Sequence, residues 1–136
     1  MNLLMITLIM LAGPMNIPVK KLIVSPTLQE KLELKENQLN EIKNIWFESR
    51  EKLIPLNARR QKLLLDIEKE LSKDDVNLEN LKKLYDELGD VISRIRYIKT
   101  KTMVSVKQVL TRKQLIKLEE ERLRWKRYPP PLPYHK

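Results

Sequence analysis

The chain has 136 residues, with 27 Lys and Arg against 18 Asp and Glu, one His, no Cys, 2 Gly and 8 Pro. Two glycines are too few for the turns of a β-sandwich or for a Gly-rich phosphate or dinucleotide loop. Without Cys there are no disulfides, Cys–zinc sites or thiol catalysis, and a single His excludes a multi-His metal cage. Charged residues make up 33% and aromatic residues 5% of the chain, which is typical of amphipathic helices. We expect an all-α interaction protein and no enzyme.

The N-terminal stretch differs in composition from the rest of the chain. Residues 3–11 are almost wholly apolar, and small residues and prolines follow them. This pattern predicts a signal peptide over residues 1–13, although no Lys or Arg precedes the apolar run. The run is shorter than the roughly 20 apolar residues that cross a bilayer, which disfavours a transmembrane anchor. An uncleaved membrane tether is the alternative. We expect export to the periplasm and an extended linker over residues 14–25.

A helical domain is predicted over residues 26–127, and its first long helix carries one apolar stripe. Ser25 is a predicted N-cap, because Pro26 can occupy the first helical position without loss of a hydrogen bond. Pro55 is expected to kink or split this helix. The stripe recurs at steps of three and four and comprises Leu39, Ile42, Ile45, Trp46, Ser49, Leu53, Leu56, Arg60, Leu63, Leu64, Ile67 and Leu71.

A second long helix follows a polar break over residues 72–77, where Asp75 or Asn77 is the predicted N-cap. Its stripe comprises Leu78, Leu81, Leu84, Tyr85, Leu88, Val91, Ile92, Ile95, Ile98, Thr102, Val106 and Val109. Two such helices predict a long antiparallel helical hairpin. Each stripe is wider than one neighbour covers, so we expect a third helix or a second chain, most simply in a dimeric cradle.

The C-terminal part is predicted to form a short flanking helix from about Thr111, with Leu115, Leu118 and Leu123 on its apolar side. It is expected to end before Pro129, because consecutive prolines cannot continue a helix. Residues 128–136 are therefore predicted to be a Pro-rich disordered tail. The charge is uneven: residues 101–136 hold ten Lys and Arg against three acids, whereas residues 1–100 hold seventeen against fifteen.

Two short segments bracket the predicted hairpin, namely Leu34-Lys35-Glu36-Asn37-Gln38 and Leu110-Thr111-Arg112-Lys113-Gln114. Through these segments, the chain resembles the LTxxQ proteins, which include the Spy/CpxP-like periplasmic stress proteins and their heavy-metal-resistance relatives. The resemblance covers about residues 28–120. It implies a helical hairpin that closes with a second LTxxQ segment, and a dimer with a basic, partly apolar concave face.

The physical reading of the motif is helix capping. The Thr111 hydroxyl can accept from the free N–H groups of the next helix, and Gln114 stands where a capping-box side chain reaches back. In the first copy Lys35 replaces the Thr and cannot accept that hydrogen bond, so the first helix is expected to run through from Pro26. Leu34, Gln38, Leu110, Thr111 and Gln114 are therefore expected to be structural.

The resemblance implies an ATP-independent chaperone that binds unfolded or flexible proteins. Candidate client-binding residues combine aromatic and cationic side chains: Trp46, Phe47, Arg50, Arg59, Arg60 and Lys62. One alternative is a heavy-metal-resistance or metal-sensing adaptor that modulates the periplasmic domain of a sensor kinase. We expect no cofactor, since His135 stands in the tail and Met103 is isolated, although zinc or another divalent metal remains an alternative.

A second alternative rests on the basic C-terminal third, where Arg122, Arg124, Lys126 and Arg127 surround Trp125. Such a segment is typical of a coiled-coil adaptor that lies on an anionic membrane or contacts nucleic acid. Export would exclude nucleic acid as the partner.

Overall fold

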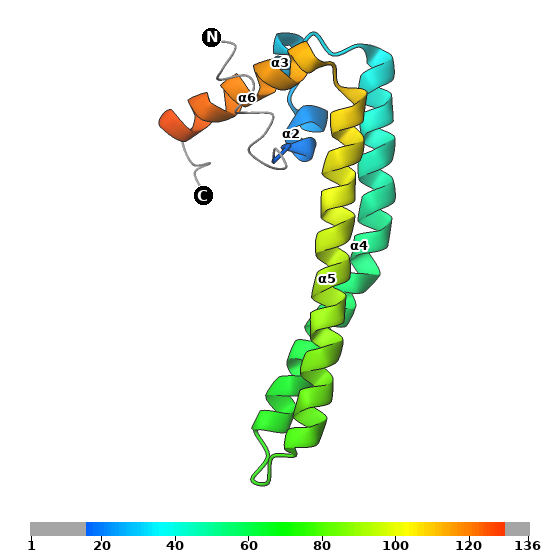
Figure 1. Ribbon diagram of the computed structural model, residues 1–136, viewed down its shortest axis with the longest axis vertical. Helices are drawn as coiled ribbons and strands as arrows, with labels where there is room; N and C mark the ends of the chain where they lie inside the picture. Colours follow the sequence, from blue (N-terminus) through cyan, green and yellow to red (C-terminus); the bar gives the residue numbers. More distant parts are fainter. Residues whose placement is uncertain (1–15, 130–136) are drawn as a thin grey trace, which may run out of the picture. The chain divides into compact units, whose positions relative to one another are not determined.

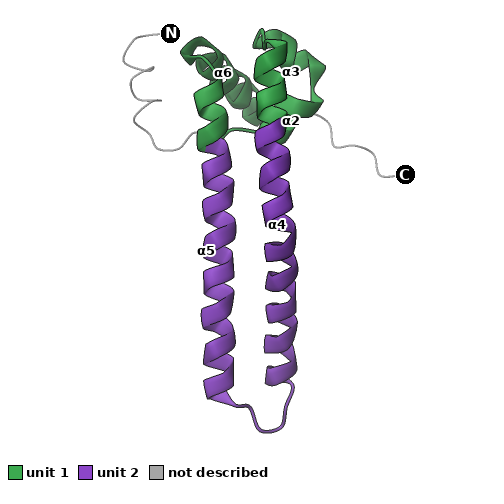
Figure 2. Ribbon diagram, turned by 90° about the vertical axis from the view of Figure 1, so that its right-hand side faces the viewer, with its two compact units in different colours: residues 1–43, 104–136 green, residues 44–103 purple. Residues whose placement is uncertain are grey.

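The computed structural model describes residues 16–129, which are helical apart from short connections (Figure 1). Within residues 16–129, five helices follow one another: α2 (Val19–Val24), α3 (Pro26–Lys31), α4 (Glu36–Leu71), α5 (Leu78–Val109) and α6 (Arg112–Arg127). Two compact units can be distinguished (Figure 2): the hairpin unit, residues 44–103, and the motif unit, residues 16–43 and 104–129. The predicted signal peptide and residues 130–136 of the predicted tail lie outside the described residues.

In the hairpin unit, α4 and α5 run antiparallel (Figure 2), which confirms the predicted helical hairpin. Its core is built from the predicted stripes, and Leu63 at its centre is fully buried. Because these side chains recur every three or four residues, one side of each helix is apolar and packs against the other helix. The buried cluster consists of Leu53, Leu63 and Ile67 from α4 with Leu88, Val91 and Ile95 from α5.

One polar contact is buried among these apolar side chains. The Thr102 hydroxyl oxygen lies 2.8 Å from Ser49 Oγ and 2.8 Å from the Ile98 carbonyl oxygen. A hydroxyl has one proton, so Thr102 donates to the carbonyl and accepts from Ser49. Ser49 and Thr102, the two hydroxyl residues within the predicted stripes, are therefore hydrogen-bonded to each other.

Pro55 does not split α4, which continues from Glu36 to Leu71 with the proline inside it. Proline lacks the N–H that would bond to the carbonyl of Glu51, four residues earlier. The rest of the helix is held by its packing against α5, so the missing bond does not end it. Of the two expectations for Pro55, the split is wrong.

The connection between α4 and α5 spans residues 72–77, as predicted, and is organised by a carboxylate. Glu70 is 2% exposed, and its Oε1 accepts from the backbone N–H of Asn77 at 2.8 Å. Lys73 donates to Oε2 of the same carboxylate. These two hydrogen bonds hold the pKa of Glu70 below its usual range. Asn77 in turn caps α5, since its Oδ1 accepts from Asn80 N at 3.1 Å, so Asn77 rather than Asp75 is the cap.

The N-terminal part of the motif unit corrects one prediction. Residues 19–24, expected to belong to an extended linker, form the helix α2. Val19 and Leu22 are buried on the same side of this short helix, three residues apart. Pro18 stands before its first turn, where a missing N–H does no harm. Burial of two apolar side chains, rather than local propensity, explains why this segment is helical.

A second prediction is also wrong: the first helix does not run through from Pro26. Ser25 caps α3 as predicted, with its side chain accepting from Leu28 N at 3.2 Å, but α3 ends at Lys31. Glu33 then adopts a left-handed conformation with φ of 51°, and α4 starts only at Glu36. Leu32, 3% exposed, lies within this bend, so the break allows an apolar side chain to enter the core.

The predicted C-terminal helix is α6, which begins after Thr111, ends at Arg127 before the prolines, and buries Leu115 and Leu118. Leu123, also expected on its apolar side, is exposed. None of the helices described between residues 16 and 129 is both long and apolar enough to cross a membrane.

Candidate functional site

The two motif segments meet in the motif unit through their glutamines. Gln38 Nε2 donates to Gln114 Oε1 at 2.9 Å, and Gln114 Nε2 donates to Gln38 Oε1 at 3.0 Å. The two amides thus form a reciprocal pair between residues that are 76 positions apart. No local pattern predicts this pairing, because it depends on where the chain returns after the hairpin.

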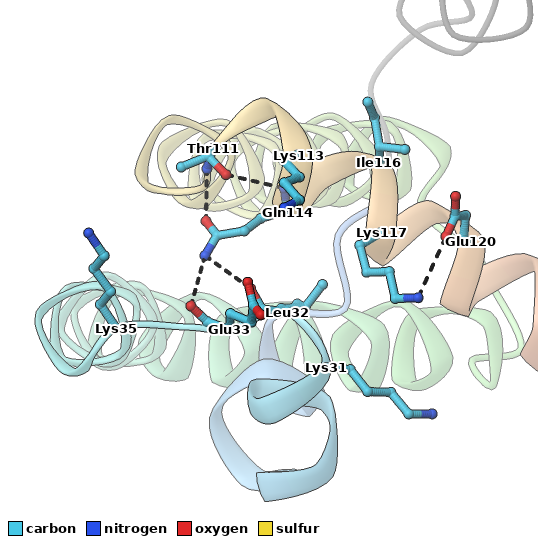
Figure 3. Close-up of a pocket in the computed structure, with 10 residues that line it drawn as sticks. All are labelled: Lys31, Leu32, Glu33, Lys35, Thr111, Lys113, Gln114, Ile116, Lys117 and Glu120. Carbon is cyan, nitrogen blue, oxygen red and sulfur yellow. Dashed lines mark hydrogen bonds and ion pairs between the residues drawn. The ribbon is translucent and has the colours of Figure 1, made fainter. Parts of the chain in front are cut away.

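Each glutamine also caps its own helix. Gln38 Oε1 accepts from the backbone N–H of Lys35 at 3.1 Å, and Gln114 Oε1 accepts from that of Thr111 at 2.9 Å. The Thr111 hydroxyl accepts from Gln114 N at 3.2 Å, which completes the predicted capping box (Figure 3). Both motif copies therefore use the glutamine in the same way at the N-terminus of a helix.

The remaining amide protons bond to backbone carbonyls. Gln38 Nε2 donates to Val109 O at 3.1 Å, and Gln114 Nε2 donates to Leu32 O at 3.2 Å. Figure 3 shows the Gln114 amide between Thr111 and the backbone of residues 32 and 33. Each amide therefore has partners for both of its donors and for its oxygen. A fully satisfied amide offers nothing to a ligand, so these residues tie chain segments together.

The first copy compensates for its missing threonine. The free N–H of Gln38 bonds to Asn37 Oδ1 at 2.9 Å, whereas the equivalent N–H of Gln114 bonds to Thr111. Lys35 keeps the backbone role of an N-cap, since its carbonyl accepts from Leu39 N at 3.0 Å. Replacement of the threonine therefore leaves the start of α4 in place. The other two predicted motif residues are apolar: Leu110 is buried and Leu34 is half-buried.

An open depression of about 520 Å³ lies beside the capping box in the motif unit. Four lysines line it: Lys31, Lys35, Lys113 and Lys117 (Figure 3). Two of them have acidic partners, because Lys31 lies 3.2 Å from the buried Glu121 and Lys117 lies 3.8 Å from Glu120. The depression is therefore a solvated surface with partly compensated charge.

The structure brings together three of the six predicted client-binding residues. Trp46, Phe47 and Arg50 lie within little more than one turn of α4, and the Arg50 guanidinium lies 5.9 Å from the centre of the Trp46 ring. Phe47 is 58% exposed, whereas Trp46 is half-buried beside the helix–helix core. These three residues form an exposed aromatic and cationic group in the hairpin unit.

The other three predicted residues are not part of this group. At about 100° per residue, Arg59 lies about 120° around α4 from Phe47. It forms a 2.6 Å ion pair with Glu87 of α5, and Lys62 forms a 2.7 Å pair with Asp66. Arg60 is half-buried. Arg59 and Lys62 therefore compensate acidic side chains of the hairpin.

Several stripe residues are exposed, which the periodicity did not predict. Leu64, Leu71, Leu78 and Tyr85 belong to the predicted stripes, but between 50% and 75% of each residue is accessible. Tracing α4 and α5 at about 100° per residue places them on the side of the hairpin opposite the Arg59–Glu87 pair. Phe47 and Ile54 are also exposed, but they lie about 100° further around α4, away from its contact with α5. We call the surface formed by Leu64, Leu71, Leu78 and Tyr85 the apolar face.

Within residues 16–129, no three His, Asp or Glu side chains are grouped so that they could hold a metal ion, and His135 lies outside that range. In comparisons with known proteins, the chain matches no family model, no curated protein and no solved structure. The similarity to the LTxxQ proteins therefore stays a prediction based on the two motif segments and the hairpin between them.

Proposed function

We propose that this protein is an exported, ATP-independent chaperone that binds unfolded or flexible protein clients through the apolar face of the hairpin unit. The supporting observation is the unequal distribution of side chains around the hairpin. One side carries the ion pairs of Arg59 and Lys62, and the other exposes four large apolar side chains. Exposed apolar side chains that gather on one side of a soluble protein are typical of an interaction surface.

The chemistry of the hairpin unit suits weakly specific binding. The Arg50 guanidinium lies 5.9 Å from the centre of the Trp46 ring and about one helical turn from the exposed Phe47, so a cation borders aromatic side chains on the same helix. Such a surface attracts acidic, flexible chains electrostatically and gains a modest free energy from apolar burial. A second copy of this chain would compete with clients for the apolar face, because each apolar stripe is wider than its helical neighbour covers.

Light scattering of a chemically unfolded client, diluted into buffer with the full chain and without ATP, tests this function. We expect near-stoichiometric suppression of aggregation that weakens with salt and does not depend on zinc. Suppression that requires zinc would favour the metal-linked alternative. No suppression at any ratio would exclude the chaperone and favour the sensor-modulating adaptor.

Two tyrosines of α5 provide a matched pair for locating the client surface. Tyr85 belongs to the apolar face, whereas Tyr97, which is also exposed, lines a shallow depression with Leu56 and Arg94 on another side of the hairpin. We expect Tyr85→Ser to reduce suppression strongly. Tyr97→Ser is expected to leave it unchanged. Equal losses from both substitutions would exclude the apolar face as the client site.

A further inference from the structure

A second surface, in the motif unit, combines cations with a tryptophan. Lys21 of α2 places its ammonium 3.9 Å from the centre of the Trp125 ring of α6. Together with Arg122 and Lys126, these side chains line a shallow depression of about 360 Å³, with Asn16 and Pro18 beside them. We call Lys21, Arg122, Trp125 and Lys126 the basic–Trp face. Two segments that are a hundred residues apart in the sequence build it.

The basic–Trp face has a local excess of positive charge. No carboxylate of residues 16–129 lines the depression, and residues 122–127 contain four cations and no acid. Arg122 pairs with Glu119 at 2.9 Å, whereas neither Lys21 nor Lys126 forms an ion pair within residues 16–129. The motif unit carries thirteen Lys and Arg against seven acids in its described ranges, compared with thirteen against eleven in the hairpin unit. The charge excess is therefore concentrated in the unit that holds this face.

The position of the face along the chain points to one partner. Asn16 and Pro18 border the face, and the apolar run of residues 3–11 ends five residues before Asn16. Five residues span at most about 18 Å, because an extended chain advances about 3.5 Å per residue. If residues 3–11 entered lipid, the face would lie within about 18 Å of the membrane surface, which is about two Debye lengths at physiological ionic strength. The same cations would attract an anionic surface after removal of residues 1–13, since that segment carries no ionisable side chain.

We propose that the basic–Trp face docks on an anionic lipid membrane. Lysine and arginine are attracted to the headgroup charge, and a half-buried tryptophan suits the interface because one end of its ring system is apolar and the indole N–H is polar. The Lys21–Trp125 contact orders both side chains before they meet the membrane, so less conformational entropy is lost on docking. The client-binding apolar face lies in the other unit, so this proposal stands independently of the proposed function.

The test measures binding of the full chain to phosphatidylcholine vesicles with and without phosphatidylglycerol. The apolar residues 3–11 contribute in both lipids, whereas the basic–Trp face contributes only when the lipid is anionic. We expect Lys21→Gln/Lys126→Gln to weaken binding to the anionic vesicles roughly 20- to 30-fold and to leave binding to phosphatidylcholine unchanged. The matched control is Lys82→Gln/Lys83→Gln, which removes the same charge from exposed positions of α5. It is expected to change binding less than threefold, because those lysines lie in the other unit.

Fluorescence of Trp125, in a Trp46→Phe background that leaves one tryptophan, gives a second measurement. We expect a blue shift on anionic vesicles only, since the indole moves from water to the interface. Equal binding to both lipids, equal effects of the two lysine pairs, or no shift of Trp125 would each overturn the proposal. Tighter binding of the same face to duplex DNA than to vesicles, lost in Lys21→Gln/Lys126→Gln, would assign the face to nucleic acid instead.

Discussion

Gln38 and Gln114 donate to each other's side-chain oxygen, and each also accepts from the N-cap residue of its own helix. The start of α4 and the start of α6 are therefore coupled through one pair of amides. A change in either glutamine affects a capping interaction at one helix and leaves polar atoms without partners at the other. This coupling gives a direct test of why the two motif copies share a glutamine.

Substitution of either glutamine by alanine is expected to lower the free energy of unfolding by about 2 kcal/mol, because a cap is lost and a buried amide loses a partner. The double substitution Gln38→Ala/Gln114→Ala should cost about 1 kcal/mol less than the sum of the two single changes, since both break the same pair. Urea unfolding of the four proteins gives this coupling energy. Gln108→Ala, at an exposed position of α5, is the control and should change stability by less than about 0.5 kcal/mol. Strict additivity would mean that the amides do not interact in solution.

Lys35→Thr restores the residue that the first motif copy lacks. The new hydroxyl can accept from Gln38 N, which now bonds to Asn37 Oδ1 within the first turn. We expect a gain of about 0.5 kcal/mol, less than a new cap gives where no acceptor is present. The reverse change at the second copy, Thr111→Ala, removes a hydroxyl that has no such substitute and should cost about 1 kcal/mol. Thermal unfolding compares the two, and a loss of stability in Lys35→Thr would contradict the capping interpretation.

Leu63 and Leu64 are adjacent leucines on α4 with opposite environments. Leu63 is fully buried in the hairpin core, whereas Leu64 is 50% exposed on the apolar face. Leu63→Ala is expected to cost about 3 kcal/mol through lost burial and a cavity, and Leu64→Ala less than about 1 kcal/mol. Unfolding at low protein concentration measures both. If Leu64→Ala lowers the free energy of unfolding as much as Leu63→Ala does, and if this loss grows with protein concentration, a second copy covers the apolar face.

The Glu70 carboxylate predicts an acid sensitivity of the hairpin turn. Its pKa is lowered in the folded chain by hydrogen bonds from Lys73 and from the Asn77 backbone. A carboxylate whose pKa is lower in the folded than in the unfolded chain stabilises the fold at pH values above its unfolded pKa of about 4.3. This stabilisation is lost as the pH falls through the folded pKa. Stability measured from pH 7 downward should therefore decrease below about pH 4.5. In Glu70→Gln the decrease over this range should be smaller, and an unchanged pH profile would contradict the role of Glu70.

The sequence by itself determined the two long helices, the C-terminal helix and several of their ends. The apolar spacing at three and four residues predicts the two long helices, and Asn77, Thr111 and Pro129 mark where helices begin or cannot continue. These signals are short-range: a cap bonds to atoms within one turn, and a stripe reflects the helical repeat itself. These local interactions are present in the folded chain because no long-range contact replaces them.

Only the tertiary structure decided which apolar residues are covered and which polar residues meet. Leu64 and Leu63 satisfy the same spacing rule, but the path of α5 along α4 covers only one of them. The bend at Glu33 and the helical state of residues 19–24 depend on burial of Leu32, Val19 and Leu22 in the motif unit. The amide pair arises because the chain returns after 76 residues to the point where the hairpin began. Long-range packing of this kind has no periodic signature, since it depends on three-dimensional contacts and not on the order of neighbours along the chain.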